Sequence, residues 1–244
     1  MSSHLVDQVR DAGVVGAGGG GFPAHVKLAT SAETVIVNGA ECEPLLHKDA
    51  EMMEHRAEEL IHGLLLVAEA VGAREAVIGL KEKNAKAVKA CNAVCEGTMA
   101  RVHLLDNYYP AGDEVDLVFE VTGKLIPAAG LPKDVGCLVS NVESIINMAR
   151  AAEGKPVIRK TLTIAGAVAE PYPTEVPVGV SFRELIERAG GATVPDPVLM
   201  NGGMMMGALV ENLDNPVTKT TGGLIVLDRS HPVIARKLHP LKFQ

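Results

Sequence analysis

This sequence of 244 residues lacks several features that would point to particular classes of protein. Tryptophan is absent and aromatic residues make up only 3% of the chain, so the stacking platforms of nucleic-acid binding proteins are missing. The formal net charge of −7 also argues against a nucleic-acid partner. No apolar run is long enough to cross a bilayer. The first residues, Met1–Asp7, have neither the basic nor the apolar region of a signal peptide, which predicts a cytoplasmic protein.

The cysteines and histidines form no metal-binding pattern. None of the cysteines forms a C-x-x-C pair, so we expect neither an iron–sulfur cluster nor a structural zinc held within this chain. The spacing of Cys91 and Cys95 is that of neighbours on a helix, which favours packing over chemistry. His55 and His62 share a helix face, and we interpret them as surface or boundary residues rather than metal ligands.

The most unusual stretch that is present is a glycine loop, Gly16–Gly21, with five glycines in six positions. A backbone with almost no Cβ atoms lets a bulky anion reach main-chain N–H groups, as phosphate binding requires. Pro23 is suited to open a helix, whose free N–H groups would then point back at the loop. Lys27, one turn further on, could add a positive charge. A flexible hinge is the alternative interpretation, although it explains neither Pro23 nor Lys27.

The glycine loop contains G-x-G-x-x-G, but its context differs from that of the dinucleotide fingerprint, which stands between a strand and a helix. The residues before it, Ser3–Gly13, have the spacing of a short capped helix. The strand, Thr34–Val37, follows the loop. A standard Rossmann turn is therefore not expected, and no Gly-Lys-Ser/Thr follows to make a P-loop.

The composition, 47% hydrophobic and 22% charged, is that of a globular protein of one or two domains. Residues 1–155 alternate apolar strands with amphipathic helices, which predicts an α/β domain with a parallel sheet. The predicted strands are 34–37, 76–80, 101–105 and 137–139, and the predicted helices are 51–71, 84–95, a stretch ending at 121, and one opening at 141. Residues 156–228 contain short strands and one helix capped by Ser181, which predicts a second, small α+β domain of β-grasp type. We interpret residues 229–244 as a C-terminal tail without a core of its own.

Acidic loops follow two of the predicted strands. Glu41 and Glu43 come after the first strand, and Asp113 and Glu114 come after the third. Ligands bind at the carboxyl ends of strands in open α/β sheets, and carboxylates there can accept from sugar hydroxyls and ring N–H groups. Each carboxylate could equally be a solvated loop residue. Together with the glycine loop they favour a phosphorylated, hydroxyl-rich ligand, a flavin or a nicotinamide nucleotide, and do not separate the two.

Four motifs occur in the order found in a known family. They resemble the flavin subunit of respiratory complex I, and more closely its relatives, the RnfC-like proteins and the PduS-like cobalamin reductases of propanediol-utilising microcompartments. The resemblance extends from about Val9 to Leu227. The motifs are Gly16–Pro23 with Lys27, Asn38–Pro44, Tyr109–Glu114 and Val139–Ser144.

The resemblance implies an FMN-binding α/β domain followed by a soluble-ligand-binding β-grasp (SLBB) domain. It implies that Gly16, Gly18, Gly19, Gly21 and Lys27 hold the FMN phosphate region. Asn38, Glu41 and Glu43 would lie along the ribityl chain and the ring. Tyr109, Gly112, Asp113 and Glu114 would lie beside the ring and the incoming nicotinamide. Val139, Ser140, Asn141 and Ser144 would close the phosphate side, and Phe22 would be the one remaining aromatic on which the adenine of NADH stacks.

Members of this family take a hydride from NADH onto FMN and pass electrons singly to iron–sulfur clusters. The resemblance therefore implies an FMN-dependent NADH dehydrogenase component with no catalytic side chain, because hydride transfer is the cofactor's chemistry. The ferredoxin-like cysteine clusters of RnfC and PduS have no counterpart here, so 4Fe-4S clusters are expected only on a missing domain or a partner subunit. Ala17 also stands where the complex I subunit has arginine. The module would be cytoplasmic, peripheral to a membrane complex, or inside a microcompartment.

A function of another class stays open. The run Asn201–Gly207 contains three successive methionines flanked by glycines, which can make an adaptable apolar surface. The β-grasp domain could then hold a cobalamin-like or quinone-like molecule or a partner subunit, with the α/β domain as a platform. Core filling by the methionines is the simpler interpretation of the same run.

Overall fold

The computed structural model describes residues 2–239. Met1 and residues 240–244, the last part of the predicted tail, lie outside the described residues. The chain divides into two compact units. The first contains the residues up to Cys42 together with Asp49–Val157, and the second contains Glu43–Lys48 and the residues from Ile158 on. None of the helices within residues 2–239 is both long and apolar enough to cross a membrane.

The first unit is built on a four-stranded sheet with the order β3-β2-β1-β4, in which every pairing is parallel. The two central strands are buried along nearly their whole length, as the apolar runs predict. The parallel arrangement places the carboxyl ends of all four strands at one edge, where ligands bind in open α/β sheets. The strands are β1 (Thr34–Gly39), β2 (Glu75–Lys81), β3 (Ala100–Leu105) and β4 (Cys137–Asn141).

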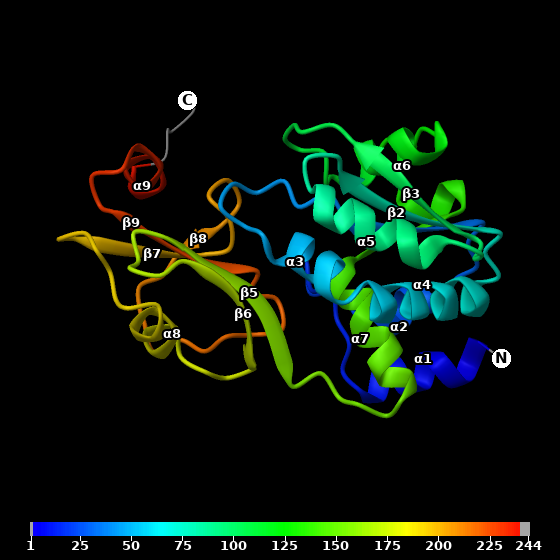
Figure 1. The fold of residues 1–244 in the computed structure, drawn as a ribbon, viewed down its shortest axis with the longest axis horizontal. Helices are drawn as coiled ribbons and strands as arrows, with labels where there is room; N and C mark the ends of the chain where they lie inside the picture. Colours follow the sequence, from blue (N-terminus) through cyan, green and yellow to red (C-terminus); the bar gives the residue numbers. More distant parts are fainter. Residues whose placement is uncertain (1, 240–244) are drawn as a thin grey trace. The chain divides into compact units, whose positions relative to one another are not determined.

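Helices cover both faces of this sheet (Figure 1). On one face a large core forms between the sheet and α1, α2, α4, α5 and α7, whereas α6 covers the opposite face. Both cores consist mainly of aliphatic side chains, which explains how the unit packs with so few aromatic residues. The helices are α1 (Ser2–Asp11), α2 (Ala24–Leu28), α3 (Lys48–His55), α4 (Ala57–Val71), α5 (Ala85–Cys95), α6 (Glu114–Thr122), a 3₁₀ turn (Pro132–Val135) and α7 (Val142–Ala152).

The predicted long helix 51–71 is two helices, so this prediction was wrong. The break is at Arg56, whose backbone has left helical geometry (φ −132°, ψ 31°). The position carries neither glycine nor proline, so the sequence contains no local helix-breaking residue that predicts the break. Gly72, in the left-handed region at φ 72°, ends α4 as the sequence indicated.

The second unit has a five-stranded mixed sheet with the order β6-β5-β9-β7-β8. Its central strands β5 and β9 are parallel, and the outer pairings are antiparallel. Helix α8 (Phe182–Arg188) packs Phe182 and Leu185 onto this sheet, and the hydroxyl of Ser181 accepts from the amide of Glu184 at its start. The predicted fold class, a parallel α/β domain followed by a small α+β domain, is confirmed. The strands are β5 (Arg159–Gly166), β6 (Tyr172–Pro177), β7 (Pro197–Asn201), β8 (Ala208–Leu209) and β9 (Gly223–Asp228).

The second unit differs from the sequence-based expectation at two places. The predicted tail contains a helix, α9 (Pro232–Leu238), which buries Ile234 among side chains of β7 and β9. The segment Glu43–Lys48, predicted within the first domain, belongs to the second unit. Its contacts are long-range: the amide of His47 donates to the hydroxyl of Thr163 at 3.0 Å, and Leu46 packs against the core that contains Ile234.

Candidate functional site

The glycine loop is closed at its base by backbone hydrogen bonds. The amide of Gly16 donates to the carbonyl of Phe22 at 2.8 Å, and the amide of Gly21 donates to the carbonyl of Gly16 at 3.1 Å. A bridge between Val15 and Pro23 continues this closure, so the loop is not a hinge between separate segments. Pro23 directly precedes α2, which is a helix of only five residues.

The tip of the loop offers free backbone donors. Within the described part of the chain, the amides of Gly18, Gly19 and Gly20 donate no hydrogen bond, and all three residues are exposed. No atom lies within 4 Å of where a Cβ would stand at Gly19 or Gly20. Gly19 has φ +114°, a backbone conformation that favours glycine. Successive open amides of this kind fit the oxygens of a phosphate group.

The start of α7 meets the glycine loop from the other side. The hydroxyl of Ser144 accepts from the amide of Ala17 at 2.9 Å. The side chain of Asn141 caps α7 by accepting from the amide of Glu143 at 3.0 Å, and its Nδ2 donates to Asp49 Oδ2 at 2.8 Å. A Cβ on Gly18 would lie 3.5 Å from Cβ of Asn141. The structure therefore brings the first and fourth motifs together, with the positive end of α7 near the open amides.

The second and third motifs also meet. Asn38, at the end of β1, donates from Nδ2 to the carbonyl of Gly112 at 2.8 Å and accepts at Oδ1 from the amide of Ala40 at 3.2 Å. A Cβ on Gly112 would lie 3.3 Å from the carbonyl of Ala40 and 3.4 Å from Sγ of Cys42, so glycine permits the close approach of the two loops. Both predicted ring-side loops thus lie at the carboxyl edge of the sheet.

The two carboxylates of the third motif have different surroundings. Asp113 is exposed and caps α6, accepting from the amide of Val115 at 2.9 Å. Glu114 forms an ion pair with Lys27, with 3.2 Å between Nζ and Oε1. Lys27 Nζ also donates to the carbonyl of Val139, in β4, at 2.8 Å. Tyr109 is exposed in the same loop.

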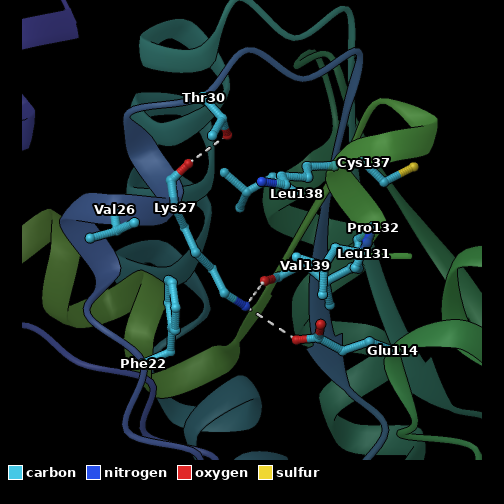
Figure 2. A pocket seen from close by; sticks show the side chains of 11 residues that line it. Phe22, Val26, Lys27, Thr30, Glu114, Leu131, Pro132, Cys137, Leu138 and Val139 are labelled. Carbon is cyan, nitrogen blue, oxygen red and sulfur yellow. Dashed lines mark hydrogen bonds and ion pairs between the residues drawn. The ribbon is translucent and has the colours of Figure 1, made fainter. Parts of the chain in front are cut away.

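A cavity of about 310 Å³ adjoins this ion pair (Figure 2). Figure 2 shows the side chain of Lys27 crossing from α2 towards Val139 and Glu114, with the ring of Phe22 at one side of the opening. Phe22 is 49% exposed, so about half of its surface is open to solvent. The cavity links the first, third and fourth motifs. It is lined by Phe22, Val26, Lys27, Thr30, Glu114, Leu131, Pro132, Lys133, Cys137, Leu138 and Val139.

Three other predicted site residues have local roles in the structure. Glu41 Oε2 accepts from the amide of Asp49 at 3.0 Å, at the start of α3. Glu43 belongs to the second unit, where its carboxylate accepts from the amides of Met205 and Met206, each at 2.8 Å. Ser140 is buried in β4. The assignment of these residues to cofactor binding stays a prediction.

Sequence reasoning missed Lys81, a buried lysine at the end of β2. Its Nζ donates to the carbonyl of Tyr108 at 3.0 Å, so it contacts the loop that carries the third motif. Burial lowers the pKa of Lys81, and the like charge of Lys83 lowers it further, while Cys42 acts in the opposite direction. The available signal was a lysine directly after the apolar run 76–80.

Three of the cysteines are buried, whereas Cys42 is half-buried beside Gly112. Burial, with a smaller contribution from Cys95, raises the pKa of the Cys91 thiol to about 12. Burial also raises the pKa values of Cys95 and Cys137. These three thiols therefore carry little thiolate at neutral pH, as expected of packing residues.

Comparison with known proteins identifies the family of the chain. Residues 9–150 match the family model described as the Nuo51 FMN-binding domain. The chain belongs to the Nuo51 FMN-binding family. Residues 161–209 of this family member match the SLBB domain, within the second unit. The predicted resemblance to RnfC and PduS-like proteins is confirmed as well.

Two curated relatives and one solved structure are similar to this Nuo51 family member. It is 52% identical to cobalamin reductase PduS of Salmonella typhimurium, over 97% of the chain and 52% of the relative. It is 36% identical to a component of the proton-translocating ferredoxin:NAD(+) oxidoreductase complex of Clostridium ljungdahlii, over 93% of the chain and 51% of the relative. The chain thus spans about half the length of these relatives. A crystal structure of an NAD⁺-reducing [NiFe]-hydrogenase has the same fold, with TM-score 0.78 and 23% identity over 93% of the chain and 47% of the hydrogenase chain.

Proposed function

We propose that this protein is a flavin-dependent electron-transfer module that oxidises NADH through FMN and passes the electrons to an iron–sulfur domain or subunit. The observation that carries the proposal is the row of open amides at Gly18–Gly20, directly after Ala17, whose amide donates to Ser144 in the first turn of α7. The family match supports FMN as the ligand of these amides. FMN supplies the chemistry of hydride acceptance and single-electron release.

In this proposal the phosphate end of FMN binds at the glycine loop. Three backbone donors and the partial positive charge at the start of α7 provide attraction for a dianion. Lys27, which the resemblance assigns to the phosphate region, pairs with Glu114 in the structure, so its charge is not used at the phosphate in this proposal. This arrangement accounts for Ala17, where the complex I subunit has arginine, because the amide of Ala17 donates to Ser144 and the charge is supplied by the backbone. Asn141 stays in place through its hydrogen bond to Asp49.

The ring end of FMN would lie at the loops that Asn38 ties together. Asn38 and Gly112 bring the backbone of two loops to the carboxyl edge of the sheet, where carbonyl and amide groups can pair with the polar edge of a flavin. Asp113 and Glu114 follow directly. Glu114 is paired with Lys27, whereas the negative charge of the exposed Asp113 would disfavour gain of electrons by the flavin and so favour release of electrons to the next acceptor.

We place NADH in the cavity beside Lys27 and Glu114. The exposed ring of Phe22 offers a stacking face for adenine, and aliphatic side chains such as Val26 and Leu131 line the same space. The ion pair between Lys27 and Glu114 can open to pair the ammonium with a ligand phosphate and the carboxylate with a ribose hydroxyl. The role of these side chains is to orient NADH and to exclude water.

An anaerobic reduction experiment tests the proposal. Purified protein loaded with FMN should lose its flavin absorbance on addition of NADH, and an added one-electron acceptor should restore the absorbance. NADH that leaves the absorbance of bound FMN unchanged, while dithionite removes it, would contradict the NADH assignment. Failure of the protein to retain any FMN would contradict the flavin assignment itself.

A second candidate function rests on the methionine run. Met205 and Met206 are 54% and 79% exposed, so core filling does not explain them. The carboxylate of Glu43 and the ammonium of Lys237 hold the backbone of this loop within the second unit. The exposed methionines favour a role of the SLBB domain in holding a cobalamin-like or quinone-like molecule or a partner subunit. Titration of the full chain with cobalamin, compared with a Met205→Ser, Met206→Ser variant, tests the small-molecule form of this candidate.

A further inference from the structure

Lys81 is a buried charged residue to which neither the sequence motifs nor the proposed chemistry gives a role. Its side chain is 2% exposed at the end of β2, a central strand of the sheet. Nζ donates to the carbonyl of Tyr108 at 3.0 Å and lies 3.5 Å from Oδ1 of Asn107. Burying an ammonium group is costly unless hydrogen bonds compensate it, and here the compensating groups all belong to one loop.

That loop, residues 106–112, joins β3 to α6 and is called the tyrosine loop below because it contains Tyr108 and Tyr109. It has a second anchor at its far end, where Asn38 donates to the carbonyl of Gly112 at 2.8 Å. Strands β1 and β2 are neighbours, so the two anchoring side chains stand on adjacent strand ends. Between the anchors, Ala111 is buried while both tyrosines are exposed.

We propose that Lys81 is a positioning residue that, together with Asn38, clamps the tyrosine loop over the carboxyl edge of the sheet. The clamp fixes the carbonyl of Gly112 and the start of α6, and with them Asp113 and Glu114. The consequence for the flavin rests on the proposed function: a loop released from Lys81 would leave the ring side of the FMN site disordered and weaken FMN binding. The clamp itself is a property of the protein without ligand.

The chain offers a matched control for this proposal. Lys83 is exposed and lies only two residues further along, so Lys83→Met removes the same charge from nearly the same place without touching the clamp. Lys81→Met keeps most of the volume of the buried stem and removes the donor. Because that change also removes the cost of burying a charge, we expect no fall in thermal stability. Lys81→Arg keeps a charged donor and tests rescue.

The tyrosine loop can be observed directly. The chain has no tryptophan and three tyrosines, of which Tyr108 and Tyr109 lie in the loop. In a Tyr172→Phe background the tyrosine fluorescence therefore reports on the loop alone. Hydrogen exchange of peptides covering residues 106–112 provides a second measurement on the same protein, and fluorescence titration with FMN provides a third.

In Lys81→Met we expect exchange in residues 106–112 to be at least about tenfold faster than in the wild type, with lower tyrosine anisotropy and about tenfold weaker FMN binding. Lys83→Met should match the wild type in all three, and Lys81→Arg should recover at least part of each loss. If hydrogen exchange of residues 106–112 and tyrosine anisotropy in Lys81→Met equal those of the wild type, the proposal is overturned, whether or not FMN affinity changes.

The outcomes also separate this inference from the proposed function. If Lys81→Met loosens the loop but the wild type binds no FMN, the clamp stands and the flavin assignment fails. If Lys81→Met does not fold, Lys81→Gln, which shortens the reach of the donor, takes its place. Wild-type loop exchange in Lys81→Gln would likewise contradict the clamp.

Discussion

The hydroxyl of Ser144 accepts a hydrogen bond from the amide of Ala17 at 2.9 Å, although 127 positions separate the two residues. Ser144 belongs to the first turn of α7, and Ala17 is the buried residue directly before the exposed tip of the glycine loop. The same hydroxyl donates to the carbonyl of Val15 at 3.4 Å. One buried side chain therefore holds the glycine loop against the start of the helix that follows β4.

Replacing Ser144 by alanine should weaken FMN binding as well as stability. Loss of the hydroxyl removes the acceptor for the amide of Ala17, which we expect to cost about 1 kcal/mol of unfolding free energy. Ser181→Ala is the matched control, since its hydroxyl accepts the amide of Glu184 at the start of α8 in the second unit. Both variants should be destabilised to a similar extent in urea, but only Ser144→Ala should bind FMN about tenfold less tightly. Equal FMN affinity in the two variants would contradict this role of Ser144.

A side chain at Gly19 should interfere with the anion site. Gly19→Ala introduces a Cβ at φ +114°, which strains the backbone and redirects the neighbouring amides. Gly97→Ala is a suitable comparison, because Gly97 has φ +74° and equally open surroundings in the turn after α5. We expect both variants to lose about 1 kcal/mol of stability and only Gly19→Ala to lose FMN affinity, by at least about tenfold. Isothermal titration with FMN measures the difference.

Phe22 should contribute to NADH binding and little to FMN binding. Stacking of a base on an aromatic ring is worth ~1–3 kcal/mol, so Phe22→Ala should raise the NADH concentration needed for half-maximal flavin reduction by roughly fivefold to 150-fold. Phe119→Ala removes a similarly exposed ring, 47% against 49%, from the surface of α6. Stopped-flow reduction of bound FMN at several NADH concentrations would show the effect. If the two variants behave alike, adenine does not stack on Phe22.

The cysteines should differ in reactivity. Cys42 is half-buried, whereas the raised pKa of Cys91, about 12, leaves that buried thiol protonated at pH 8. With an aromatic disulfide reagent that releases a coloured thiolate, the native protein should therefore show one rapidly reacting thiol per chain. The denatured protein should show four. Because Cys42 lies beside Gly112, FMN should slow the rapid reaction. Two or more fast equivalents in the native protein would contradict the burial of the other thiols.

The same raised pKa predicts a loss of stability in alkali. In the unfolded chain the Cys91 thiol ionises at its ordinary pKa, while in the folded protein it keeps its proton up to about pH 12. The contribution of Cys91 is fully present below the ordinary thiol pKa and is lost as the pH rises from there towards 12. Cys91→Ala should flatten this part of the pH–stability curve measured in urea. An unchanged slope would contradict the assignment to Cys91.

Much of the first unit could be predicted because its signals are local. The strands around Val37, Val77 and Val139 are short apolar runs between turn residues, and Asn141 stands where a helix cap was expected and caps α7. Asn38, the tyrosine loop and Asn141 lie at or after the ends of β1, β3 and β4, and parallel strands end at one edge of the sheet. The glycine loop follows α1 rather than a strand, and its contact with the start of α7 through Ser144 has no such local signal. In the predicted strands and helices the same requirement, burial of apolar side chains against the sheet, determines both the sequence pattern and the three-dimensional arrangement.

The features that escaped prediction depend on distant contacts. The helix break at Arg56 has no glycine or proline, and the inclusion of Glu43 in the second unit depends on amides more than 150 residues away. Lys81 also depends on a distant contact, because its hydrogen-bond partner Tyr108 lies in the loop that follows the next strand. Helix α9 has local signals, Pro232 at its first position and His231 as a cap, which outweigh the basic composition of the segment.

The central claim is that open backbone amides at Gly18–Gly20 bind the phosphate of FMN. The most direct test is a comparison of FMN with riboflavin, which lacks the phosphate, by fluorescence titration of the flavin-free protein. We predict one FMN per chain and binding at least about a hundredfold tighter than that of riboflavin, or ~2.7 kcal/mol. Riboflavin binding as tightly as FMN would contradict the claim.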